Sequence, residues 1–243
     1  MVDILKRLIL IVGLITVGTL SIPFVFADDN EIHIKNQEGD NFNLQIDQIG
    51  YNNTIQCYIA SSCWTEGTNM SLHFHQQNFS DSENKIEIWH LEGNNNSIRW
   101  GQGAYLDGET DTTFSWDGQE SGGHYARHDI HGHSNTIAGY QQNGGGQGSH
   151  HYESLIFSDD NDIWIRQKNN GDKWLSLRTD SDGNDISILQ KTNHGEHSAT
   201  IRLMGTEPTT LNLIQKSQTN QTYNLQQTCY TTGGCNVSVT QGN

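Results

Sequence analysis

The sequence predicts an all-β protein, a β-solenoid in which two-stranded rungs of strand, turn and strand stack along one axis. Two observations lead to this fold class. Isoleucines recur between an asparagine and a glutamine at fixed offsets, in the form N-x-I-x-Ω-x-Q, where Ω is often Ile. Short stretches rich in Gly, Asn, Asp and Ser separate these segments, and such residues favour turns because they tolerate left-handed backbone angles.

Composition supports the same fold and limits the function. The 243 residues include 13 Lys+Arg and 28 Asp+Glu, for a formal net charge of −15. Nucleic-acid binding depends on clustered Lys and Arg, so we exclude nucleic acid as a partner. Leu, Ile, Val and Phe supply roughly 17% of the positions after Ala27, too few for a large conventional core. A thin core of one or two isoleucines per strand suffices if stacked amides and backbone hydrogen bonds supply the remaining stability.

Residues 1–27 form the first predicted segment, a secretory signal peptide. Lys6 and Arg7 precede a long apolar run, and the small residue Ala27 comes directly before two aspartates. This pattern indicates cleavage after Ala27 and a mature chain that has no membrane span. A retained N-terminal membrane anchor is the alternative.

Residues 28–227 form the predicted repeat region. The alternation sends the asparagine, isoleucine and glutamine of each copy to one face of a strand. Clear copies begin at Asn53, Asn84, Asn96, Asn135, Asn161 and Asn184. Weaker copies begin at Glu31, Phe42, Met70, Thr112, His151, Lys173, His197, Thr209 and Gln221.

Strand plus turn recurs every ~12 residues in the C-terminal half, which predicts a rung of about 24 residues and about six or seven rungs. Stacked rungs would place isoleucine on isoleucine and form hydrogen-bonded amide ladders. An ordinary β-sandwich or barrel is the alternative, because its strands also alternate. A sandwich, however, does not require the same amides at fixed offsets from the isoleucine.

The repeat resembles the curlin repeat of bacterial curli fibre subunits, Q-x-G-x-x-N-x-A-x-x-x-Q. Gln48, Gly50 and Asn53 match its first half, with Ile55 at the small apolar position. Further matches carry a glycine before the asparagine, as in Gly93 with Asn96 and in Gly132 with Asn135. The predicted ladder residues are Gln48, Asn53, Asn96, Gln102, Asn135, Gln141, Asn161, Gln167, Asn184, Gln190, Gln215, Asn220 and Gln226.

This resemblance implies a secreted or cell-surface structural subunit of a Gram-negative bacterium, which stacks end to end into an amyloid-type fibre of a biofilm matrix or an adhesive. The implied partners are further copies of the chain, other curli-like subunits and a dedicated outer-membrane export apparatus. A solenoid end is an open strand edge, and such an edge is a template for another chain. A monomeric β-solenoid adhesin or carbohydrate-binding surface protein is the alternative.

Residues 228–243 are predicted to form a C-terminal segment closed by a disulfide. Four cysteines form two similarly spaced pairs, Cys57 with Cys63 and Cys229 with Cys235. An even count with matched spacing in an exported protein suggests disulfides, most simply two local loops. Zinc binding by these cysteines is disfavoured because the spacers are long and the pairs lie far apart in the sequence.

Histidines are the strongest remaining signal for chemistry. Four of them fall between positions 124 and 133, and His73 and His75 share one strand face, a pair that could bind Zn²⁺ or Cu²⁺. Nothing in the sequence completes a ligand set, so we predict no metal site and no cofactor. Aspartate-rich turns suggest occasional surface Ca²⁺, although their spacing differs from that of calcium-binding nonapeptides. Catalytic motifs are absent, and we predict that the protein is not an enzyme.

Overall fold

The protein is a β-solenoid, as the sequence predicted. The computed structural model describes residues 30–33, 39–41, 43–56, 67–88, 90–110, 113–116, 122–143, 149–168, 171–191 and 195–242. These residues contain strands and turns, no helix, and about seven full turns of the solenoid. The predicted signal peptide, Cys57 and Cys63 lie outside them. Within the described ranges no helix is long and apolar enough to cross a membrane.

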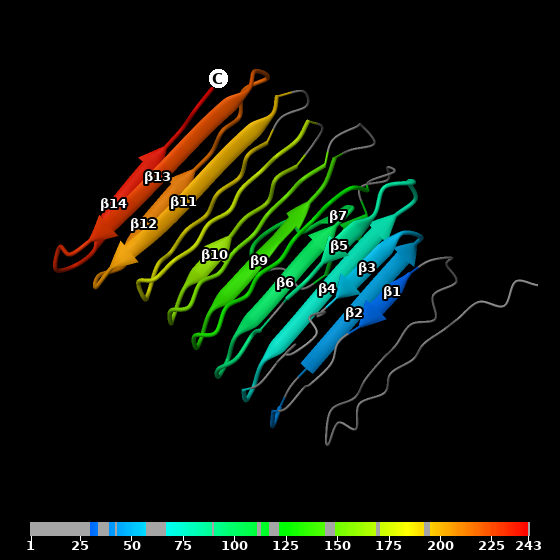
Figure 1. The fold of residues 1–243 in the computed structure, drawn as a ribbon, viewed down its shortest axis with the longest axis horizontal. Helices are drawn as coiled ribbons and strands as arrows, with labels where there is room; N and C mark the ends of the chain where they lie inside the picture. The colour runs from blue at the N-terminus through cyan, green and yellow to red at the C-terminus, as the bar shows by residue number, and fades with distance from the viewer. Residues whose placement is uncertain are drawn as a thin grey trace, which may run out of the picture.

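Fourteen strands are assigned in the described residues, and Figure 1 shows most of them side by side in one stack, from blue at the N-terminal end to red at the C-terminal end. They are β1 (Glu31–His33), β2 (Asn43–Gly50), β3 (Asn53–Gln56), β4 (Ser71–Asn78), β5 (Asn84–Ile86), β6 (Ser97–Gln102), β7 (Ala104–Tyr105), β8 (Ser115–Trp116), β9 (Thr136–Gln141), β10 (Asp162–Trp164), β11 (His197–Gly205), β12 (Thr209–Leu213), β13 (Gln221–Cys229) and β14 (Cys235–Val239).

Two parallel sheets make up the two faces of the solenoid. The glutamine sheet contains β2, β4, β6, β9, β10, residues 185–190, β12 and β14. The histidine sheet contains β1, β3, β5, residues 124–131, 150–157 and 173–180, β11 and β13. Each rung is one segment of the histidine sheet followed by one of the glutamine sheet, so the chain reverses direction once within every rung.

The strand pairing in the C-terminal half agrees with the predicted rung length. Ile163 pairs with Ile137 on one sheet, and Lys173 pairs with His150 on the other. Each pair joins equivalent positions of two successive repeats. β14 pairs in parallel with β12, so the stack extends into the segment after residue 227. Because β14 belongs to this sheet, the disulfide-closed turn lies within the solenoid.

The core is a narrow column of apolar side chains between the two sheets. The central isoleucine of each clear repeat copy, such as Ile98, Ile137 or Ile186, is fully buried, as the alternation predicts. Trp100 is the largest core residue, and its ring stacks on Tyr152 with centroids 4.5 Å apart. The core is therefore partly aromatic at that level of the stack.

An insertion interrupts the regular spacing between β6 and β9. Residues 103–123 contain the antiparallel pair β7 and β8, and beyond them Tyr125 pairs with Lys85, a partner far back in the sequence. Side chains of the insertion pack on the outer surface of the glutamine sheet, where Leu106 forms a second apolar cluster with Tyr140 and Trp164. Trp164 lies on the outward face of its strand, yet it is only 8% exposed because this cluster covers it.

Candidate functional site

A column of glutamine amides runs through the solenoid along the ends of the glutamine-sheet strands. Its members are fully or almost fully buried: Gln48, Gln76, Gln102, Gln141, Gln167, Gln190 and Gln215. In the N-terminal half each Nε2 donates to the Oε1 one rung further along, at 2.9 Å from Gln48 to Gln76 and 2.8 Å from Gln76 to Gln102. Neighbouring rungs are therefore joined by side chains as well as by backbone.

The direction of donation reverses in the C-terminal half. Gln190 donates back to Gln167 at 2.7 Å, and Gln215 donates back to Gln190 at 2.6 Å. Gln141, the last acceptor of the N-terminal run, is not bonded to Gln167; the two Nε2 groups donate to backbone carbonyls instead. The column thus consists of two runs of amides that meet between β9 and β10.

The same amides also join the two sheets. Gln76 Nε2 lies 3.0 Å from the carbonyl oxygens of both Thr54 and Asn84, which are on the histidine sheet. Gln141 Nε2 donates to Tyr125 O at 2.6 Å and to His150 O at 2.8 Å. A buried amide must find partners for its polar atoms, and these contacts meet that requirement at the end of each rung.

A second column, made of asparagines, occupies the turn that leads into the glutamine sheet. Asn135 N donates to Asn96 Oδ1 at 2.9 Å, and the same contact follows from Asn161 to Asn135 at 3.1 Å and from Asn184 to Asn161 at 3.1 Å. Thr209 N ends the run by donating to Asn184 Oδ1 at 2.7 Å. Each Oδ1 therefore holds the backbone of the next turn in register.

The corresponding corner of the histidine sheet changes from asparagine to histidine along the stack. Asn84 Nδ2 lies 3.5 Å from Asn53 Oδ1, and Asn84 Oδ1 accepts from His124 N at 3.2 Å. His124 Nδ1 then accepts from His150 N at 3.3 Å, so the ring nitrogen takes over the role of the amide oxygen. That role requires an unprotonated Nδ1.

Burial sets the protonation of this histidine column. Desolvation lowers the pKa of His124 well below its ordinary value, with a smaller contribution from nearby His150. Desolvation likewise lowers the pKa of His150 to about 4, and the positive charge of Lys173 acts in the same direction. Both rings are therefore neutral at pH 7, which keeps His124 Nδ1 available as an acceptor.

Two predicted ladder residues lie elsewhere. Asn220 and Gln226 are exposed, because the inward positions of β13 are taken by Tyr223, Leu225 and Gln227. Asn220 nevertheless joins two rungs at the surface, because its Oδ1 accepts from Glu196 N at 3.0 Å and its Nδ2 donates to the Glu196 carboxylate at 3.2 Å.

Three amides that continue the columns were missing from the predicted set. Gln76 and Asn84 belong to the buried columns described above. Gln241 comes after β14, at the position opposite Gln215 on the preceding rung. Its Nε2 lies 3.4 Å from Thr222 O on the histidine sheet. Gln76 and Asn84 could have been assigned to the columns from the sequence, because both stand in repeat copies at the expected offsets.

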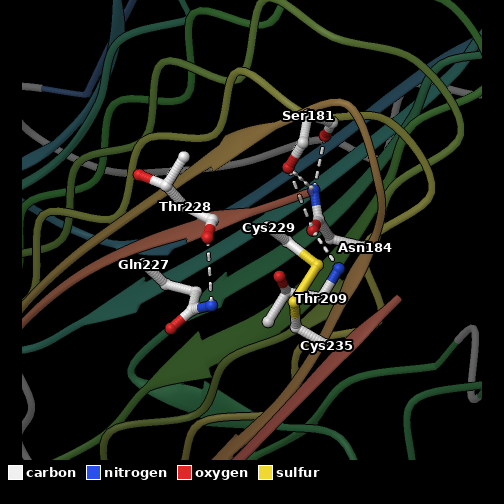
Figure 2. The surroundings of a disulfide bond; sticks show 7 residues. All are labelled: Ser181, Asn184, Thr209, Gln227, Thr228, Cys229 and Cys235. Carbon is white, nitrogen blue, oxygen red and sulfur yellow. Dashed lines mark hydrogen bonds between the residues drawn. A yellow bond between two sulfur atoms is a disulfide. The ribbon is translucent and has the colours of Figure 1, made fainter. Parts of the chain in front are cut away.

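The last turn of the stack is closed covalently. Cys229 ends β13, Cys235 begins β14, and the two form a disulfide (Figure 2). Thr209 lies one rung beyond Asn184 in the asparagine column, and Cys235 pairs with Thr209. Cys235 therefore occupies the position of this column on the last rung. The local pairing predicted for these two cysteines is found, and it closes the turn where the column no longer supplies an asparagine.

The C-terminal rung has an open edge. Among the described residues, β13 pairs only with β11 and β14 pairs only with β12. Its inward apolar residues, which include Leu225 and Val237, are partly buried, whereas Ile201 and Leu211 on the preceding rung are each 1% exposed. This end therefore presents unpaired backbone groups together with an incompletely covered core.

Comparisons with known proteins give no assignment. No protein family, curated protein or solved structure matches the chain.

A groove on the outer surface of the glutamine sheet is a separate feature. It has a volume of about 450 Å³ beside the insertion and is lined mostly by polar residues, together with Leu72 and Phe114. Phe114 stacks on His75 with ring centroids 5.5 Å apart and meets His73 edge-on at the same distance. Asp47 lies 3.8 Å from His75 Nδ1, and this contact lowers the pKa of Asp47.

Proposed function

We propose that the chain is a structural subunit of an extracellular fibre and that it assembles by end-to-end stacking of β-rungs. The observation that supports this most directly is the open edge formed by β13 and β14. A parallel strand edge of this kind pairs readily with the backbone of another chain, because its N–H and C=O groups point along the stacking axis.

The exposed core at this edge adds a driving force. Leu225, Val237 and Val239 would become fully buried if another rung covered them. Burial of apolar surface contributes about 25 cal/mol per Å². The same contact would satisfy the free strand edges, so backbone pairing and core burial favour the same geometry.

Charge sets the conditions for assembly. The full chain has a formal net charge of −15, and loss of residues 1–27, which contain Asp3, Lys6 and Arg7, makes the subunit more negative, so stacked copies repel one another. Salt screens this repulsion over a Debye length of about 8–10 Å near physiological ionic strength. We therefore expect fibres to form faster as the salt concentration rises.

A matched pair of variants tests the role of the open edge. Leu225→Lys places a charge at an inward position of β13, whereas Asn224→Lys adds the same charge at the neighbouring outward position. We expect wild type and N224K to form fibres that bind thioflavin T and are visible by electron microscopy, and L225K to remain unassembled. A wild-type chain that stays monomeric for days at high concentration, or equal assembly of the two variants, would refute the proposal.

The resemblance of the repeat to curlins extends this proposal to the setting of the fibre. We infer a secreted, cell-surface subunit that reaches the surface through a dedicated outer-membrane apparatus and joins other curli-like subunits. Detection of the chain on intact cells by surface-directed antibody labelling would test this location.

The outer groove supports a second candidate function, carbohydrate binding by a monomeric solenoid. Phe114 gives the groove an aromatic surface, and Asp47, His73 and Arg99 surround it with hydrogen-bonding groups. Aromatic and polar groups combined in this way are suited to a sugar ring. Phe114→Ala should then abolish binding on a glycan array and leave fibre formation unchanged, and an array on which wild type binds nothing would exclude this function.

A further inference from the structure

Three side chains that can bind a metal ion meet at one corner of the histidine sheet. His90 and Glu92 come from the chain between β5 and β6, and His131 comes from the next rung. Their ligand atoms all lie within 4.8 Å of one another, and each residue is partly buried. Because His131 is far from the other two residues in the sequence, no local sequence motif predicts the cluster.

One pair in the cluster already has the spacing of metal ligands, since His90 Nε2 lies 3.2 Å from Glu92 Oε2. The rings of His90 and His131 are packed against each other, with centroids 3.8 Å apart. Zinc bonds of about 2.0–2.1 Å in a tetrahedron hold neighbouring ligand atoms about 3.4 Å apart. Two imidazoles on one tetrahedral zinc ion have ring centroids about 5 Å apart, so binding requires the partly exposed His131 ring to turn away from His90.

The described residues offer three protein ligands at this corner, and no fourth His, Cys, Asp or Glu among them joins the group. Nearby His133 is not a ligand candidate, because its Nδ1 already accepts from Asn94 N at 3.0 Å.

We propose that His90, Glu92 and His131 bind one Zn²⁺ ion, with water at the fourth position. Two imidazoles and one carboxylate are a common zinc ligand set, and they disfavour hard cations such as Ca²⁺, which prefer oxygen ligands.

The position of the cluster gives this ion a structural role. The two rungs that it would connect are separated by the insertion of residues 103–123, so their paired positions, such as Lys85 and Tyr125, lie further apart in the sequence than those of the other described rungs. Closing a longer loop costs more chain entropy, and a metal crosslink offsets part of that cost. Zn²⁺ would therefore join the solenoid at its longest described connection.

Calorimetric titration of Zn²⁺ into the purified chain, carrying no polyhistidine tag, tests the proposal. We expect one ion to bind with micromolar or tighter affinity. Loss of a group that only hydrogen-bonds to a metal ligand weakens metal binding by roughly 10- to 100-fold. His131 is itself a proposed ligand, so His131→Gln should weaken Zn²⁺ binding by at least about 100-fold. Co²⁺ should give an intense visible absorption of a tetrahedral site in wild type and not in this variant.

Two further variants keep the result interpretable. Glu92→Gln changes a side chain that is 45% exposed and preserves its shape, so a loss of affinity of at least about tenfold cannot come from misfolding. His75→Gln removes a histidine from the outer groove and should leave affinity unchanged. The proposal is wrong if wild type binds no Zn²⁺, if E92Q and H131Q bind as tightly as wild type, or if H75Q abolishes binding.

Discussion

Gln141→Ala tests whether the amide column holds the rungs together. The Gln141 side chain accepts from Gln102 at 2.9 Å and donates to two backbone carbonyls, at 2.6 and 2.8 Å. Each such bond contributes about 0.5–1.5 kcal/mol net, and truncation also leaves a buried cavity. We therefore expect the free energy of unfolding to fall by about 3–5 kcal/mol.

Urea denaturation followed by circular dichroism measures this loss. With a slope of about 3 kcal/mol per M, the midpoint should fall by about 1–2 M. Gln226→Ala is the matched control, because Gln226 is exposed on β13, and its effect should stay within about 0.5 kcal/mol. Equal midpoint shifts in the two variants would show that buried amides contribute no more than surface ones, which would refute the reasoning.

Three other outcomes follow from the structure. His150 has a pKa of about 4 when folded and takes up a proton near 6.5 when unfolded, so this ring alone should lower the free energy of unfolding by about 1.4 kcal/mol for each unit that the pH falls from 6.5 to 4. Burial also lowers the pKa of other histidines, which makes the total slope steeper: His128, His151 and His197. Urea midpoints across that range check the slope, and a flat profile would contradict it. Gly139→Ala would place a Cβ 2.6 Å from the Trp100 ring and should cost about 1–3 kcal/mol by overpacking; the same substitution in a Trp100→Leu background should cost less in thermal melts. Reduction of Cys229–Cys235, which closes a short loop, should remove about 2 kcal/mol, seen as faster hydrogen exchange in β13 and β14 and not in β9.

Much of the fold could be predicted because the repeat uses the same residues at the same offsets. An isoleucine flanked by asparagine and glutamine, as in Asn161 to Gln167, specifies which side chains face inward and which amides stack. The sequence therefore indicated the rung length and most of the column. The structure adds how each amide is shared, since one Nε2 bonds both to a neighbouring rung and to the opposite sheet.

The failures have two physical origins, one local and one long-range. Gln226 was placed by repeat spacing, although strand alternation in β13 puts Tyr223 and Leu225 inward and leaves Gln226 outside. The insertion and the His90–His131 contact depend on residues that meet only after the chain has coiled. Local patterns carry no information on such distant encounters.

The reversal of amide polarity has a mechanical consequence. Between β9 and β10 the glutamine column is interrupted, whereas Asn161 Nδ2 still donates to Asn135 Oδ1 at 2.8 Å at the other end of the strands. Under axial tension we expect this junction to open like a hinge, with the asparagine corner as its pivot. Single-molecule stretching would then record a first rupture that divides the molecule into two unequal blocks.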